Sequence, residues 1–575
     1  MTRFLSAFVA LLFLAGAHAQ VAPSAPIAAI PPAQGILAHN GMVVAQEQRA
    51  ARIGVEILDR GGNAVDAAVA VGFALAVTYP RAGNLGGGGF MVIHLANGTD
   101  TSIDYRETAP AAATPTMFLD AQGNPDAQKS RDSGLAVGVP GTVAGLALAL
   151  QKYGSGKFTL ADVIAPAITL AEEGFPVEDD LADSLPQARA RLSRFPSTTA
   201  IFLNGGESLH EGDRLLQFDL ADTLRAIADN GPRVFYTGDI AARIAAAVRA
   251  AGGIMTADDL AHYQAIERTP VRGTYRGYDL ISMPPPSSGG VCLIEMLNIL
   301  EGYDLAKLDR AEALHDMIEA MKRAYADRAV YLGDPGSVSV PVVSLISKKY
   351  AASLRAGISA RATPAADIRP GQPTDDEGHN TTHFSVIDRD GNAVSNTYTL
   401  NFSFGLGLVA DGTGVLLNNE LDDFSAKPGA ANAYGLVGFD KNLPGPGKRP
   451  LSSMTPVIVL KGGKPVLITG SPGGSRIITA VLQVISDVID LHMPLAQAVS
   501  MPRLHHQWEP DKVYVEPGFA PAVLEALQAR GHVIEPTALH TAANSIAVIP
   551  QGEFTPQAYV GVADTRTRGA LAAGY

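Results

Sequence analysis

The stretch from residue 382 to residue 400, THFSVIDRDGNAVSNTYTL, constrains the fold of this chain more than any other. It alternates between polar and apolar residues as strands do, and RDGN interrupts it. Asp-Gly between two alternating segments is a strong signal for a tight β-hairpin. We therefore expect two adjacent antiparallel strands here, preceded by a polar loop or linker over 360–380.

Segments of strand and helix recur in both halves of the chain. The stretch 63–77 is rich in Ala and Val and predicts a buried helix, and 84–95 predicts a glycine loop that leads into a strand. The other expected helices are 287–303 with serine caps, an amphipathic 311–334, 475–491 and most of 159–262; the other expected strands are 455–461, 464–470, 544–550 and 558–564. This mixture predicts a layered α/β or α+β fold in which helices cover sheets.

The N-terminus has the pattern of a secretory signal peptide, 1–19. Arg3 precedes the apolar run FLSAFVALLFLAGA, and AHA at 17–19 fits a small-residue cleavage site. A membrane anchor or a buried first helix is the alternative, but no later stretch is long and apolar enough for a membrane helix. We expect a mature chain that begins near Gln20 and is periplasmic or secreted.

Composition narrows the class of protein further. Cys292 is the only cysteine, so no intrachain disulfide is possible, and a chain of 575 residues can bury a large core without one. The formal net charge of −13 argues against nucleic acid or an anionic membrane as a partner.

Thr381 opens the first strand of the hairpin, directly after a polar run. A threonine hydroxyl is a weak nucleophile, but an N-terminal threonine can use its own α-amine as the base, with a pKa of about 7.7–8.0. Attack of Thr381 Oγ on the carbonyl of Asn380 would cut the chain and create such a terminus. The competing interpretations are an ordinary strand threonine, an N-glycosylation sequon in NTT, and a metal pair formed by His379 and His383.

A set of motifs in fixed order supports the cleavage hypothesis. After residue 380 the motifs are NTTHFSV, TYTLNFSFG, GVLLNNELDDFS, KRPLSSMTPVIV and TGSPGGSRI; before it they are NLGGGGFMV, DYRETAPAAA, VGVPGTVAGL, PAITLAEEGF, GGIMTADDLAHY and PPPSSGG. The chain resembles the γ-glutamyltranspeptidases of the N-terminal-nucleophile hydrolase superfamily over essentially its whole mature length. The resemblance implies a four-layer αββα sandwich built jointly by a large subunit, 20–380, and a small catalytic subunit, 381–575, which together form a heterodimer.

The resemblance also implies the catalytic residues. Thr381 is the nucleophile, Thr399 is similar to a second threonine that binds the nucleophile's hydroxyl, and the N–H groups of Gly473 and Gly474 form an oxyanion hole. TGSPGGSRIITAV is otherwise a candidate phosphate loop, but it lacks the Gly-Lys-Ser/Thr of a P-loop.

The remaining family residues are implied to bind a γ-glutamyl group. Arg106 matches the arginine that holds the α-carboxylate, with Ser452 and Ser453 as hydroxyl donors. The residues implied to bind the α-ammonium are Asn401, Glu420 and Asp423, and Tyr434 resembles the aromatic residue of a lid loop. Each has a plainer interpretation: a surface ion pair for Arg106, a solvated acidic turn for NELDDFS, and simple packing for Tyr434.

The implied reaction is acyl transfer without a cofactor or metal. A γ-glutamyl ester on Thr381 forms from glutathione or another γ-glutamyl amide and passes to water, an amino acid or a peptide. The rivals are a cephalosporin (glutaryl) acylase with similar motifs, a non-catalytic exported binding protein and, more remotely, a metal enzyme. A glutaryl group has no α-ammonium, so Asn401, Glu420 and Asp423 favour γ-glutamyl substrates.

Overall fold

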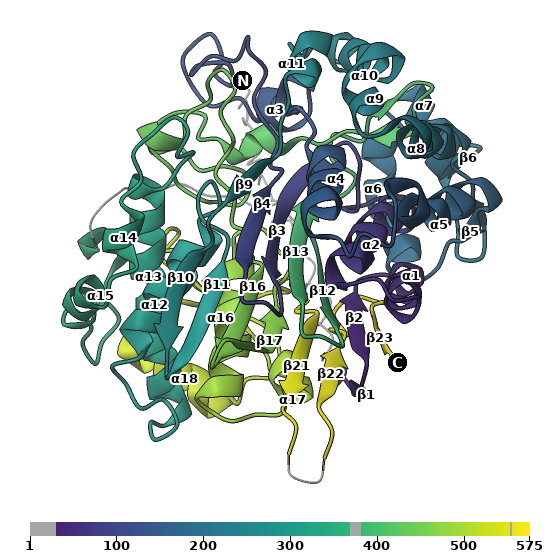
Figure 1. The fold of residues 1–575 in the computed structure, drawn as a ribbon. Coiled ribbons are helices and arrows are strands. Elements are labelled where there is room, and N and C mark those ends of the chain that lie inside the picture. The colour runs from purple at the N-terminus through teal and green to yellow at the C-terminus, as the bar shows by residue number, and fades with distance from the viewer. Residues whose placement is uncertain (1–29, 369–380, 553–554) are drawn as a thin grey trace, which may run out of the picture.

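The computed structural model describes residues 30–368, 381–552 and 555–575. The predicted signal peptide, 1–19, and Asn380, on one side of the predicted cut, lie outside the described residues. In the described part, two seven-stranded antiparallel sheets pack face to face, and helices cover both outer faces (Figure 1). This confirms the predicted four-layer αββα sandwich.

Both sheets combine strands from before and after residue 380. One sheet has the order β1 (Gly35–Ala38), β22 (Ala558–Val562), β21 (Ser545–Ile549), β17 (Lys464–Thr469), β16 (Val457–Lys461), β11 (Tyr278–Ser282) and β10 (Val271–Tyr275). The other has the order β23 (Leu571–Gly574), β2 (Gly41–Ala45), β12 (Thr382–Asp388), β13 (Ala393–Thr399), β3 (Gly88–His94), β4 (Asp100–Asp104) and β9 (Ile266–Arg268). A cut at residue 380 would therefore leave neither part with a complete sheet.

Strand alternation separates the two large clusters of the hydrophobic core; a third, small cluster lies around Phe118 and Leu421. On β2, Val43 and Ala45 pack toward the helices that cover this sheet, whereas Met42 and Val44 pack toward the other sheet. Successive side chains of a strand point to opposite faces, so a strand that is buried on both faces is apolar throughout. All five residues of β2 are buried for this reason.

Helices form the outer layers. The helices α1 (Gln48–Asp59), α2 (Ala64–Thr78) and α4 (Thr142–Tyr153) contact the sheet that contains β12; α12 (Gly289–Leu300), α13 (Arg310–Tyr331), α16 (Arg476–Ile489) and α17 (Leu495–Ser500) lie on the side of the other sheet (Figure 1). None of the helices that the structure describes is long and apolar enough to cross a membrane.

Most expected elements are confirmed. The hairpin forms as β12 and β13, and the helix expected over 63–77 is α2, which Asn63 caps and in which every residue is buried. The amphipathic character predicted for 311–334 is wrong, because α13 is buried on nearly all sides between α12 and α18 (Pro521–Arg530). Its charged side chains are accommodated by ion pairs and hydrogen bonds rather than by solvent.

His383 on β12 connects the two sheets through hydroxyl groups. Ser385 Oγ donates to the carbonyl of Asn544, so it accepts from His383 Nε2 (3.1 Å), and Thr397 Oγ1 donates to His383 Nδ1 (2.9 Å). Burial lowers the pKa of His383 to about 3, so the ring is neutral. Both ring nitrogens are engaged, which argues against the metal pair with His379; His379 itself lies outside the described residues.

Gly470 leaves the space that the His383 ring fills. A Cβ atom on Gly470 would lie 2.4 Å from His383 Cε1. We predict that Gly470→Ala displaces the ring and lowers the free energy of unfolding by about 1–3 kcal/mol, measured by urea denaturation. Gly357→Ala is the control, because the nearest atom to its new methyl group is at an ordinary 3.4 Å. Equal stability of the two variants would contradict this account of Gly470.

Candidate active site

The hairpin places two threonines side by side. Thr382 pairs with Tyr398 across β12 and β13, so Thr381, one residue before β12, lies next to Thr399 at the end of β13. Both threonines are buried and line one pocket. The full set of lining residues is Arg106, Thr381, Thr399, Glu420, Asp423, Tyr434, Ser452, Ser453, Met454, Gly474 and Ile477.

Apart from Asn380, which lies outside the described residues, the pocket gathers all of the predicted site residues except Asn401 and Gly473. Asn401 lies directly behind it: its backbone N–H donates to Thr399 Oγ1 (2.9 Å), and its side-chain oxygen accepts from the Tyr434 hydroxyl. Met454 and Ile477 were not predicted, since nothing distinguishes them from other apolar residues in the sequence.

Arg106 holds Glu420 and Asp423 in a buried ion pair. One terminal nitrogen donates to Glu420 Oε1, the other to Asp423 Oδ2, and Nε donates to the carbonyl of Pro450 (3.1 Å). Burial by itself lowers the pKa of Arg106, but Glu420 and Asp423 outweigh that effect and raise it. The group predicted to bind a carboxylate and the groups predicted to bind an ammonium are thus paired with one another in this structure.

Glu107 is a fourth charged group at this site that the sequence reasoning missed. Its Oε2 lies 3.8 Å from an Arg106 nitrogen, and neither oxygen has a hydrogen-bond partner among the described residues. Burial raises the pKa of Glu107 to about 7. The only sequence feature that could have indicated Glu107 is its position next to Arg106 in YRETAP. Side chains of adjacent residues in an extended segment usually point to opposite faces, so this feature did not predict a shared site.

Ser452 is fixed by the loop that leads into α12. Ser452 N donates to the carbonyl of Pro286 (2.9 Å), and both N and Oγ of Ser288 donate to the carbonyl of Ser452 (2.8 and 2.7 Å). The serine cap predicted before α12 is made by Ser287, whose Oγ accepts from the N–H of Gly289, the first residue of the helix (3.2 Å). Ser288 occupies the N-cap position, but its side chain binds the carbonyl of Ser452 instead of the helix.

The glycines at 473 and 474 permit a close backbone approach. Both have positive φ, 131° and 57° respectively. A Cβ on Gly474 would lie 2.4 Å from Tyr434 Cδ1, and one on Gly473 would lie 2.8 Å from Thr541 Cγ2. Only glycine fits position 474 without displacing the ring of Tyr434, and only glycine fits position 473 without displacing Thr541.

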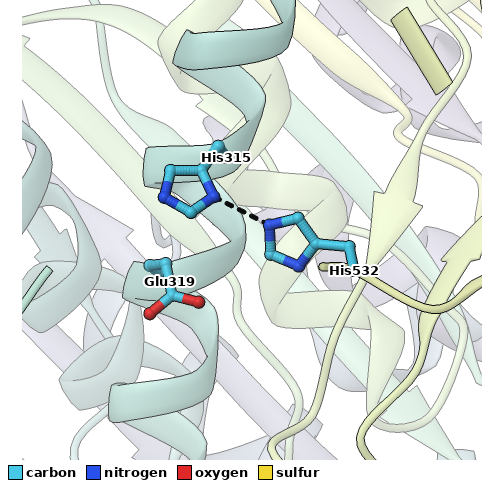
Figure 2. Close-up of side chains that lie close together, drawn as sticks. All are labelled: His315, Glu319 and His532. Atoms are coloured by element: carbon cyan, nitrogen blue, oxygen red, sulfur yellow. Dashed lines mark hydrogen bonds between the residues drawn. The ribbon is translucent and has the colours of Figure 1, made fainter. Parts of the chain in front are cut away.

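A second group of titratable side chains lies outside this pocket (Figure 2). His315 and Glu319 on α13 and His532 after α18 have ligand atoms within 4.8 Å of one another. This donor set can bind zinc. Here, however, the Glu319 carboxylate is already paired with Lys322 (3.1 Å) and Arg323 (2.7 Å).

The hydrogen bonds of this group assign its protons. His315 Nε2 must donate to the carbonyl of Ser359 (2.7 Å), so in the neutral ring Nδ1 accepts from His532 Nε2 (2.8 Å; Figure 2). His532 Nδ1 then carries no proton, and it has no hydrogen-bond partner among the described residues. The cluster is therefore a buried network of neutral histidines beside an ionised Glu319 carboxylate, whose charge is balanced by Lys322 and Arg323.

Sequence comparisons cover almost the whole chain. The γ-glutamyltranspeptidase family model matches residues 50–574. The curated glutathione hydrolase proenzyme of Escherichia coli (strain K12) is 53% identical over 544 residues, which cover 94% of this chain and 93% of that protein.

Structural comparisons include both substrate classes considered above. The crystal structure of cephalosporin acylase from Bacillus halodurans superposes with a TM-score of 0.83 at 30% identity, covering 96% of this chain and 99% of that one. The γ-glutamyltranspeptidase of Helicobacter pylori superposes with a TM-score of 0.55 at 48% identity, covering 57% of this chain and 95% of that one. The fold alone therefore does not distinguish a γ-glutamyltranspeptidase from a cephalosporin acylase. The distinction has to come from the residues of the pocket.

The histidine cluster predicts a loss of stability in acid. Burial lowers the pKa of His315 and brings that of His532 to about 3. Below the unfolded pKa of about 6.5, the unfolded chain binds protons that the folded protein excludes, so stability falls by up to ~1.4 kcal/mol per pH unit for each such histidine. His532→Gln should flatten the dependence of the urea midpoint on pH between 7 and 5.

The exposed His210 offers the control for this measurement. His210→Gln should leave the pH dependence of the wild type unchanged. If His532→Gln has the same slope as the wild type, the neutral state of His532 does not contribute to stability.

Proposed function

Because this chain belongs to the γ-glutamyltranspeptidase family, whose members are acyl-transferring enzymes, we propose that it is exported, cuts itself between Asn380 and Thr381, and then transfers γ-glutamyl groups from glutathione or related amides. The observation that carries the proposal is the pocket that brings Thr381 together with Thr399, Arg106, Glu420 and Asp423. The signal-peptide pattern at 1–19 supports the export step.

Maturation uses the hydroxyl of Thr381. Its Oγ attacks the carbonyl carbon of Asn380, the C–N bond breaks, and the proton of the hydroxyl passes to the nitrogen, leaving an ester and a free α-amine. Water hydrolyses the ester to the Asn380 carboxylate and restores the hydroxyl. The product is a heterodimer of residues 20–380 and 381–575, in which both sheets still contain strands of both subunits.

The donor substrate exchanges partners with the buried ion pair. A γ-glutamyl group presents an α-carboxylate to Arg106, Ser452 and Ser453, and an α-ammonium to Glu420 and Asp423, with Asn401 behind them. The two contacts of Arg106 with Glu420 and Asp423 are thereby replaced by contacts with the substrate, Arg106 with its carboxylate and the two acidic residues with its ammonium, so no charge is left buried without a partner. This matters because an uncompensated buried charge costs several kcal/mol.

Acyl transfer then follows in two steps. The α-amine of Thr381 accepts the hydroxyl proton, Oγ attacks the γ-amide carbon, and the N–H groups of Gly473 and Gly474 stabilise the oxyanion. The proton passes to the leaving amine, and a γ-glutamyl ester remains on Thr381. Water then releases glutamate, or an amino acid or peptide takes the acyl group as a new amide. The chain's own residues supply every group that these steps use.

The alternative is a cephalosporin (glutaryl) acylase, whose fold is similar. A glutaryl group lacks the α-ammonium, and two buried carboxylates would then face the donor without a cationic partner apart from Arg106. The pocket therefore favours a γ-glutamyl donor. A non-catalytic binding protein is disfavoured, because binding alone gives no reason to place Thr381 beside Thr399.

The first prediction of the proposed function concerns maturation of the chain. Thr381→Ala has no hydroxyl to attack Asn380 and should remain a single chain, whereas Thr381→Ser keeps a hydroxyl and should still split, although more slowly. A denaturing gel of the purified variants, with N-terminal sequencing of the small fragment, measures both outcomes. Splitting of Thr381→Ala at the wild-type rate in the absence of other proteases would rule out self-cleavage.

The second prediction concerns the substrate. Asp423→Asn should lower kcat/KM for a γ-glutamyl anilide by roughly ten-fold or more, since a hydrogen bond to a charged group contributes about 1.5–3 kcal/mol. The loss for a glutaryl anilide should be smaller, because that donor has no α-ammonium.

The neighbouring Asp422 provides a matched control. It is also buried, but its carboxylate accepts from Ser130 Oγ (2.7 Å) and Arg131 Nε (3.3 Å) outside the pocket. Asp422→Asn should not change the ratio of the two donors. An equal proportional loss for both donors in Asp423→Asn, after equal maturation, would reopen the acylase alternative.

A further inference from the structure

Arg328 on α13 is a buried arginine that forms no ion pair with a carboxylate of the described residues, although the more distant Asp423 acts on its charge. Its residue is 4% exposed, its Nε donates to Ser288 Oγ (2.9 Å), and one terminal nitrogen donates to Ser453 Oγ (3.2 Å). In the part of the chain that the structure describes, no carboxylate oxygen lies within 4.0 Å of the guanidinium. Other buried arginines near the pocket, such as Arg106 and Arg449, do have such partners.

Through these bonds Arg328 holds both of the serines in the pocket. It contacts Ser453 directly, and it contacts Ser288, which donates from N and Oγ to the carbonyl of Ser452. One turn earlier on the same helix, Tyr325 donates its hydroxyl to the carbonyl of Ser475, the residue after Gly474. The face of α13 around Arg328 therefore supports two loops that line the pocket.

The direction of these hydrogen bonds leaves the serine protons available. Ser453 Oγ accepts from Arg328, and Ser452 Oγ accepts from the N–H of Met454 (3.1 Å). Neither hydroxyl donates a hydrogen bond to any described residue. A hydroxyl has a single proton, so each serine can direct that proton into the pocket toward an anion.

We propose that Arg328 is a positioning residue for the α-carboxylate of the donor: it orients Ser453 and Ser452 as donors and supplies the positive charge behind them. This inference rests on the proposed γ-glutamyl function. It assigns the carboxylate two sources of positive charge, Arg106 at the ion pair and Arg328 behind the serines. Burial desolvates the Arg328 charge, and among the described residues the carboxylate of Asp423 acts on it only from beyond ion-pair distance. Binding of a carboxylate at the serines would compensate this charge more directly.

The test compares two donors that differ only in the carboxylate. One is γ-glutamyl p-nitroanilide; the other is 4-aminobutyryl p-nitroanilide, which keeps the amine and the reacting amide but lacks the α-carboxylate. Arg328→Met should raise KM for the γ-glutamyl donor roughly ten-fold or more with a smaller change in kcat, and should change kcat/KM for the aminobutyryl donor less than about three-fold.

Arg328→Lys, which keeps the charge but not the forked geometry, should recover part of the loss in KM. Arg323→Met is the matched control: Arg323 is an equally buried arginine of α13, but it binds Glu319 and the carbonyl of Gly357 (2.8 Å) and does not contact the pocket serines. It should affect both donors alike. Arg328→Gln replaces Arg328→Met if the latter does not mature.

The outcomes separate the two proposals. Equal proportional losses for the two donors in Arg328→Met, or no loss with either, would overturn the positioning role while leaving the function intact. A matured wild-type enzyme that releases no anilide from the γ-glutamyl donor would overturn the proposed function, and with it the assignment of Arg328.

Discussion

The buried ion pair of Arg106 with Glu420 and Asp423 is the constraint on which the rest of the site depends. It joins segments more than 300 residues apart, and its three charges are removed from water together. Such a group is stable only when every charge has a partner. The ion pair therefore fixes the positions of the pocket loops relative to one another. A substrate that carries a carboxylate and an ammonium can replace the ion pair, because Arg106 and the two acidic residues each gain a partner of opposite charge.

The hairpin and the helix α13 provide the frame around this pair. The β12–β13 register sets Thr381 beside Thr399, and the glycine at position 474 allows the backbone to come close to Tyr434. Helix α13 supports the other side of the pocket through Tyr325 and Arg328. Rigid strands and a buried helix thus position groups that lie on loops, which is how a scaffold gives a site its precision.

The interleaving of the sheets explains how one chain can be cut without losing its fold. Both sheets contain strands from before and from after residue 380, and the hydrogen bonds between these strands do not require a peptide bond at 380. The large apolar area between the layers would then hold the two parts together, since burial of apolar surface contributes about 25 cal/mol per Å². Cleavage in such an arrangement changes the chemistry of one terminus while most of the packing stays.

The sequence by itself determined the hairpin, the buried helix α2, the positions along the chain of half of the strands in the two large sheets and, through its family motifs, nearly all residues of the pocket. These follow from local signals: the Asp-Gly turn, apolar runs and short motifs. Only the tertiary structure decided that Arg106 pairs with Glu420 and Asp423 and that Glu107 is buried without a hydrogen-bond partner among the described residues. It also decided that Ser288 binds the carbonyl of Ser452 instead of capping α12, and that the polar face of α13 lies inside the protein. The physical reason is that the periodicity of a sequence indicates only which face of a helix or strand is polar. Burial and ion pairing depend on which distant segment of the chain packs against that face.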